Sequence, residues 1–104
     1  MHIDGEENAL FCGGANHFKN GEAVGGKMAL LNNGVVFKSH KINIQRHELH
    51  IPLTDIIACT TYNILNVFPT GLKITLANGD TERFVVNHRD EWIAAILAAK
   101  TVNV

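Results

Sequence analysis

The sequence GLKITLANGDTERFVVNHRDEWIAAILAA, residues 71–99, predicts two strands followed by a helix, the two kinds of element from which we expect the domain to be built. Residues 71–76 alternate apolar and polar side chains, the pattern of a half-buried strand, and residues 82–86 return as a second strand. A helix then opens after Asn87, which is a favourable N-cap residue. Its apolar stripe consists of Trp92, Ile93, Ile96 and Leu97. Because one amphipathic helix cannot bury such a stripe alone, a sheet or barrel mouth built from the rest of the chain should receive it.

The turn between these two strands is predicted to contain three residues. A two-residue turn at Asn78 and Gly79 would place Ile74 opposite Arg83. A three-residue loop instead keeps the apolar residues of both strands on one face. The pattern therefore favours a type I turn with Gly79 in the left-handed conformation.

Earlier segments predict further strands, about seven in total. Residues 9–12 begin a first strand that the glycines at 13–14 should interrupt, and residues 22–31 form a long strand bent at its own glycine pair. Asn33-Gly34 predicts a two-residue hairpin turn that pairs Leu30 with Phe37. Residues 48–53 alternate again, with Pro52 favouring the end or edge of a strand.

The bulk properties indicate one ordinary globular domain. At 104 residues the chain is long enough for one core, and we expect residues 1–8 to be a loose N-terminal lead-in and residues 9–104 to be the domain. The net charge of −1 gives no support to nucleic-acid binding. The acidic start lacks the apolar core of a signal peptide, and no apolar run is long enough for a membrane span. Cys12 and Cys59 have no metal or redox spacing, which favours free, buried thiols in a reducing cytoplasm.

Several stretches together resemble the GRAM domain, a member of the pleckstrin-homology-like superfamily, and the chain is similar to the short bacterial single-domain type. The stretches that carry the resemblance are GGKMAL (25–30), VVFKSH (35–40), IPLTDI (51–56), GLKI (71–74), RFVV (83–86) and EWI (91–93). The resemblance implies a mainly β fold with one C-terminal helix: a bent antiparallel barrel of about seven strands, plugged by the helix. Because these stretches mostly determine the fold, they indicate little about function.

One group of residues is a candidate site for an anionic ligand. The only concentration of basic residues in the sequence consists of Lys38, His40, Lys41, Arg46 and His47. It surrounds the predicted loop between the third and fourth strands, and the resemblance implies that anionic lipid head groups are often bound at this position. The alternative is a solvated strand face, since histidines carry only part-time charge. The hairpin of residues 31–35 lacks the basic residue that is usual in the family.

No arrangement for catalysis or metal binding is evident in the sequence. His47 and His50 are spaced i, i+3, whereas a zinc-binding helix needs i, i+4, and no third ligand is apparent. Ser39 lacks a nucleophile elbow, and the cysteines lack a catalytic pattern. We therefore expect neither an enzyme nor a cofactor.

The segment 64–70, predicted to be a loop, is unusually apolar. Either it packs back on the domain or it contacts a partner, another copy or a membrane. Its candidate contact residues are Leu65, Val67, Phe68 and Pro69. The main interpretation is a non-catalytic module for protein contact or self-association. Peripheral binding of anionic lipid is the alternative, and an unrecognised enzyme comes third.

Overall fold

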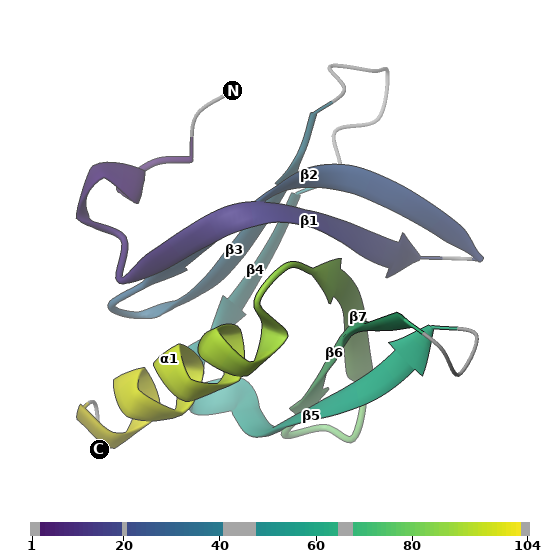
Figure 1. Ribbon diagram of the computed structural model, residues 1–104. Helices are drawn as coiled ribbons and strands as arrows, with labels where there is room; N and C mark the ends of the chain where they lie inside the picture. Colours follow the sequence, from purple (N-terminus) through teal and green to yellow (C-terminus); the bar gives the residue numbers. More distant parts are fainter. Residues whose placement is uncertain (1–2, 20, 41–47, 65–67, 103–104) are drawn as a thin grey trace.

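The structure is a computed structural model that describes residues 3–19, 21–40, 48–64 and 68–102. Within these residues, seven antiparallel strands form one sheet in the order β4-β3-β2-β1-β7-β6-β5. The sheet curls into two layers, β1 to β4 and β5 to β7, and the C-terminal helix lies across one end of the curl (Figure 1). The expected class, a bent antiparallel β fold with one C-terminal helix, is confirmed.

Two short 3₁₀ turns accompany the strands and the helix. In chain order the elements are η1 (Glu6–Asn8), β1 (Phe11–Lys19), β2 (Glu22–Leu31), β3 (Gly34–Ser39), β4 (Glu48–Pro52), η2 (Leu53–Asp55), β5 (Ile56–Ile64), β6 (Phe68–Leu76), β7 (Thr81–Val86) and α1 (Arg89–Val102). As predicted from Pro52, β4 ends at that residue and forms one edge of the sheet.

The core lies between the two layers and is closed by α1. Trp92 of the helix is only 1% exposed. Its ring meets that of Phe11 edge-to-face, with centroids 4.6 Å apart and planes at 72°. Other core residues, drawn from both layers and from the helix, are Met28, Leu30, Val35, Phe37, Ile51, Leu72, Ile74, Phe84 and Ile96. Of the predicted apolar stripe of α1, the sheet receives Trp92 and Ile96 and partly covers Ile93, whereas Leu97 is exposed.

The predicted turn between β6 and β7 is confirmed. Leu72 lies opposite Phe84, and three residues separate Leu76 from Asp80. The Leu76 N–H donates to the Asp80 carbonyl at 2.8 Å, and the Gly79 N–H donates to the Leu76 carbonyl at 2.9 Å. Gly79 has a φ of 93°, the left-handed conformation that glycine adopts without steric cost.

The predicted register of the β2–β3 hairpin is wrong, because the two-residue turn lies one residue earlier in the chain than predicted. Leu30 pairs with Val35, not with Phe37, and Asn32 and Asn33 form the two-residue turn. Gly34 is already in the strand, where a Cβ would lie 2.4 Å from the carbonyl oxygen of Ile51. This glycine is thus required by the close approach of β4 and not by the turn itself.

Two further sequence expectations do not hold. The glycines at 13–14 do not interrupt β1, which pairs with β2 without a shift from Phe11 to Lys19. Asn87 is not the residue next to the helix either: α1 begins at Arg89, and the Trp92 N–H donates to the carbonyl of His88 at 3.0 Å. His88, one of the two residues between the end of β7 and the helix, has a φ of 58°.

The N-terminal segment, expected to be a loose lead-in, packs on the outer face of the sheet. Ile3 is 3% exposed and forms a small apolar cluster with Ala29 and Val36. Glu6 accepts a hydrogen bond from the Ile3 N–H at 2.9 Å and forms an ion pair with Lys27 of β2. The contact raises the pKa of the Lys27 ammonium, because the Glu6 carboxylate stabilises its charged form.

Replacing Trp92 tests whether the helix closes the barrel. Trp92→Ala should lower the free energy of unfolding by about 3–5 kcal/mol, since it removes a buried indole and leaves a cavity. Chemical denaturation would measure the loss. Leu97→Ala is the matched control, because Leu97 lies on the same helix but is 45% exposed. A Trp92 variant as stable as the parent would contradict the closing role of α1.

Candidate functional site

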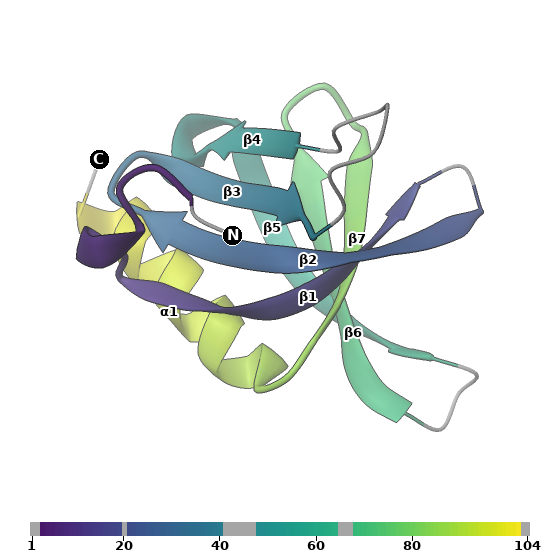
Figure 2. The same cartoon turned by 90° about the horizontal axis from the view of Figure 1, so that it is seen from above.

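The β5–β6 hairpin extends past the rest of its layer. Strand β6 last pairs with β7 at Gly71 and Val85, whereas the β5–β6 pairs continue to Ile64 and Phe68. Figure 2 shows this end of the hairpin leaving the barrel as a separate two-stranded ribbon. The prediction of a loop over 64–70 is therefore wrong at its ends, where the residues belong to strands. Pro69 is tolerated in β6 because it lies beside a break in the ladder with β5.

Two of the four candidate contact residues, Phe68 and Pro69, are located at this projecting end. Phe68 and Pro69 are the first residues of β6, and Pro69 is exposed. Leu65 and Val67 lie outside the described residues. A ribbon of two strands is marginally stable by itself, so its base needs support from other elements.

Arg89 supplies part of that support from the first turn of α1. Its Nη1 donates to the carbonyl of Tyr62 at 2.8 Å, to that of Gly71 at 3.3 Å and to the side chain of Asn63 at 3.2 Å. The register of β5 shifts between Tyr62 and Ile64, which disturbs the backbone ladder there. The guanidinium therefore satisfies carbonyl groups beside the bulge and joins the helix to both strands of the hairpin.

Tyr62 covers the other side of the hairpin base. Gly71, the residue opposite it, is buried, and a Cβ there would lie 2.8 Å from ring atoms of Tyr62. The Tyr62 hydroxyl donates to the carbonyl of Phe84 at 3.4 Å, and the guanidinium carbon of Arg83 is 5.9 Å from the ring centroid. Burial raises the pKa of the Tyr62 phenol, although the charge of Arg83 lowers it. An aromatic ring thus lies flat over a glycine on the outer face of the sheet.

The structure describes two of the five candidate anion-binding residues. Lys38 is partly buried in β3, and His40 is exposed just after that strand. Lys41, Arg46 and His47 lie outside the described residues, so their grouping stays a prediction.

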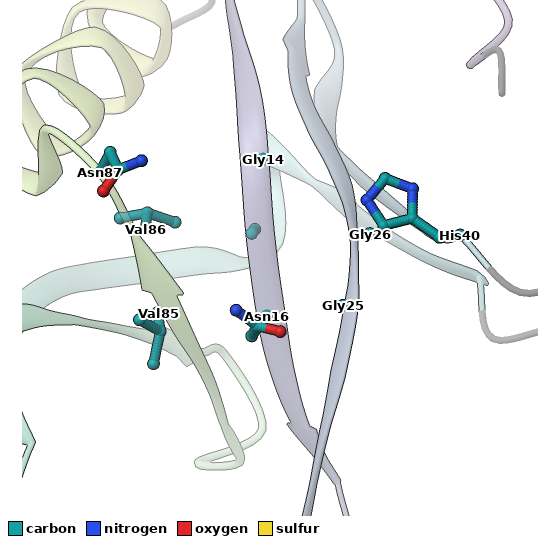
Figure 3. A pocket seen from close by; sticks show the side chains of 9 residues that line it. Gly14, Asn16, Gly25, Gly26, His40, Val85, Val86 and Asn87 are labelled. Atoms are coloured by element: carbon teal, nitrogen blue, oxygen red, sulfur yellow. The ribbon is translucent and has the colours of Figure 1, made fainter.

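A groove on the outer face of the sheet was not predicted. It has a volume of about 350 Å³ and crosses strands β1, β2 and β7. Figure 3 shows Asn87 and Val85 on one side, His40 on the other, and the backbone of β1 and β2 between them. This backbone forms the floor of the groove, to which Gly14 and Gly25 contribute no side chain. The only indication in the sequence was the glycine content of the two strands, which we interpreted as bends.

A polar pair formed by a buried histidine and a partly exposed glutamate was also missed. His17 is 2% exposed, and its Nε2 lies 2.8 Å from Oε1 of Glu82. The imidazole stacks on the ring of Phe84, with centroids 4.8 Å apart and planes at 29°. The pair joins β1 to β7 within the core, which is a structural arrangement. Alternation along β1 would have placed His17 inward, had the strand been extended through its glycines.

The described residues hold no group of three or more His, Cys, Asp or Glu side chains arranged for a metal ion. Cys12 is exposed on the outer face of β1, so the prediction that it is buried is wrong. Cys59 is partly buried, and burial raises the pKa of its thiol to about 11, with a smaller opposing effect from the charge of Lys100. In the described part of the chain, no helix has the length and apolar character needed to cross a membrane.

Comparison with solved structures identifies the class of fold. The C-terminal domain of an unknown protein from Leishmania infantum superposes with a TM-score of 0.77 at 13% identity, covering 89% of this chain and 84% of that one. The N-terminal PH domain of human ARAP2 superposes with a TM-score of 0.71 at 14% identity, covering 89% of this chain and 80% of that one. The chain therefore has a pleckstrin-homology-like fold.

A larger structure contains the same fold as one part. The linker and DH/PH domains of p115-RhoGEF match with a TM-score of 0.66 at 14% identity, over 90% of this chain and 29% of that one. No protein-family model matches the sequence, and no curated protein matches it.

Replacing Arg89 tests the support of the hairpin. Arg89→Ala should lower the free energy of unfolding by about 1–3 kcal/mol, since it leaves carbonyl groups beside the bulge without their charged donor. Hydrogen exchange should accelerate most at the amides of β5 and β6 near Tyr62 and Gly71. Arg83→Ala is the control, because Arg83 is an exposed arginine that contacts only the Tyr62 ring at this base. Equal exchange in both variants would contradict this role of Arg89.

Thiol labelling tests the two cysteine environments. At pH 8, an aromatic disulfide reagent should label one thiol quickly, because Cys12 is exposed. Cys59 should react slowly, since a pKa of about 11 leaves few thiolates at that pH. Cys12→Ser should remove the fast phase, and denaturant should restore full reactivity of Cys59. Two fast phases in the folded parent would contradict this assignment.

Proposed function

We propose that this chain is a non-catalytic binding module of the short bacterial GRAM type, acting in the cytoplasm, and that it binds a protein partner or a second copy of itself. The observation that carries this proposal is the β5–β6 hairpin, which projects beyond β7. The unusually apolar stretch of the sequence, residues 64–69, belongs to this hairpin and its connection. Apolar residues on a projecting ribbon have few neighbours of their own domain to pack against, so they favour contact with another chain.

The support at the hairpin base suits such a contact. Arg89 and Tyr62 hold both strands of the hairpin, and Pro69 restricts the backbone close to the tip. An ordered binding element loses less conformational entropy when it docks, so more of its interaction energy appears as affinity. Because β5 is also the last strand of the sheet, its outer edge can accept a strand from the partner.

The lipid alternative has weaker support. Lys38 is partly buried, His40 carries charge only when protonated, and the net charge of the chain is −1. Lys27 of β2 lies directly opposite Lys38, but its charge is already paired with Glu6. We therefore treat binding to anionic membranes as an outcome of the test.

The decisive variant is Phe68→Asp. We expect it to reduce the solution mass, or to abolish capture of a partner, while the melting temperature stays unchanged. Light scattering over a range of concentrations, a pull-down and thermal unfolding measure these quantities. Leu10→Asp is the matched control, because Leu10 is an apolar residue that is 52% exposed away from the hairpin. The control should leave association intact.

Two results would overturn the proposal. An unchanged mass with a lowered melting temperature would mean that Phe68 packs on its own domain, where a carboxylate is costly to bury. Flotation of the parent with anionic vesicles at low salt, abolished by charge reversal of Lys38, Lys41 and Arg46, would assign the module to membranes if no protein association is found.

A further inference from the structure

Three glycines of β1 and β2 have no requirement from φ or from a backbone contact: Gly13, and the outward-facing Gly14 and Gly25. A Cβ on Gly14 would have one neighbour within 4 Å, the Gly26 carbonyl oxygen at 3.9 Å. A Cβ on Gly25 would meet only side chains, Asn16 at 3.2 Å and His40 at 3.9 Å. Neither glycine has a positive φ, and the β1–β2 register runs past both without a shift.

Other glycines of the same sheet differ sharply. A Cβ on Gly26 would lie 2.2 Å from the Lys38 carbonyl oxygen, and one on Gly71 would lie 2.4 Å from that of Tyr62. These two positions exclude any larger residue. At Gly14 the backbone is bare although a side chain would fit, and at Gly25 a Cβ would fit if the Asn16 side chain moved slightly. Glycine inside a strand lowers its stability. Such glycines are expected where another group approaches the backbone closely.

Both glycines lie in the floor of the groove described above, and its walls are mainly polar. Asn16 and Asn87 provide amides, His40 provides an imidazole, and Val85 provides an apolar side (Figure 3). No carboxylate, lysine or arginine lines the groove among the described residues. Charge complementarity therefore favours a neutral group that has an apolar face and a hydrogen-bonding edge.

The molecule itself shows how an aromatic ring can cover a sheet glycine. The ring of Tyr62 lies over Gly71, on the outer face of the sheet, and its hydroxyl donates to the carbonyl of Phe84. Gly71 is buried as a result, whereas Gly14 is exposed. A volume of about 350 Å³ has room for one ring system, near the lower end of ligand pockets.

We propose that the groove binds a tyrosine or tryptophan side chain of a protein partner, with the ring flat over Gly14 and Gly25. The phenol hydroxyl or the indole N–H would bond to Asn16, Asn87 or His40. This inference rests on the proposed role in protein contact, but it assigns a second surface, separate from the hairpin tip. Tyr and Trp suit such a place because one end of each side chain is apolar and the other is polar.

Binding of blocked amino acids tests the groove directly. In ¹H–¹⁵N correlation spectra, N-acetyltyrosinamide and N-acetyltryptophanamide should cause saturable shifts at the amides of Gly14, Asn16 and Gly25. N-acetylleucinamide should cause no saturable shift there. N-acetylphenylalaninamide should bind more weakly than the tyrosine probe, and Asn16→Ala should reduce that difference.

Filling the floor should separate binding from stability. Gly14→Ala should weaken the tyrosine probe, and Gly14→Val should weaken it at least tenfold, while both keep or raise the melting temperature. The matched control is Gly13→Ala on the same strand, whose Cβ would have nothing within 4 Å and which lies on the opposite face. The control should bind the probes like the parent.

The results that overturn the inference differ from those that overturn the proposed function. Absence of groove shifts, or a melting temperature lowered by Gly14→Val but not by Gly13→Ala, would reject the aromatic site and leave the Phe68 result untouched. The parent could bind the probes while Gly14→Val still captures its partner or self-associates as the parent does. That combination would reject the partner assignment and indicate a free aromatic ligand. Loss of association in Gly14→Val, with the melting temperature kept, would support the inference even if Phe68→Asp had no effect.

Discussion

The burial of Trp92 between the two layers is the contact on which the rest of the structure depends. Strands β4 and β5 end the sheet on either side, so hydrogen bonding alone does not close the curl. The helix closes it by inserting Trp92 and Ile96 between the layers, with Trp92 against Phe11 at the start of β1. Lys100, near the helix end, bonds to the carbonyls of Leu53 and Ile56. One helix therefore fixes the distance between the layers and, through Arg89, the base of the projecting hairpin.

Apolar alternation predicted the register correctly where a wrong register would have placed an apolar side chain opposite a charged one. At the β6–β7 turn, a wrong loop length would have placed Ile74 opposite Arg83, so the sequence excluded it. The β2–β3 turn offered no such check, because the predicted partner of Leu30, Phe37, and its observed partner, Val35, are two residues apart, so both registers leave the same side chains on the same faces. Apolar alternation therefore could not distinguish the two turns.

The candidate site could not be predicted from the pattern of residues along the chain. Arg89, Tyr62 and Gly71 are close only because β5, β6 and α1 meet in the folded chain. The spacing of these residues in the sequence does not predict that contact. The groove is still harder to foresee, since it consists of absent side chains on two strands. A glycine pair has the same appearance in a sequence whether the strand bends, another backbone approaches, or a surface is left bare. Only the position of a hypothetical Cβ separates these cases, and that position is a property of the folded chain.

The separation of these cases bears on how a small domain can carry a binding surface. The fold demands Gly26, Gly34 and Gly71, because a carbonyl oxygen occupies the place of each Cβ. It does not demand Gly14 and Gly25, and a domain of this size has little stability to spare. If selection acted on stability alone, β-branched residues would be favoured at both places, as they are elsewhere on sheet surfaces. The contrast with Gly71, covered by Tyr62, shows that an aromatic ring is a physically sufficient cover for such a surface. At Gly14, where no carbonyl oxygen takes the place of a Cβ, the ring of the proposed partner would supply the same kind of cover.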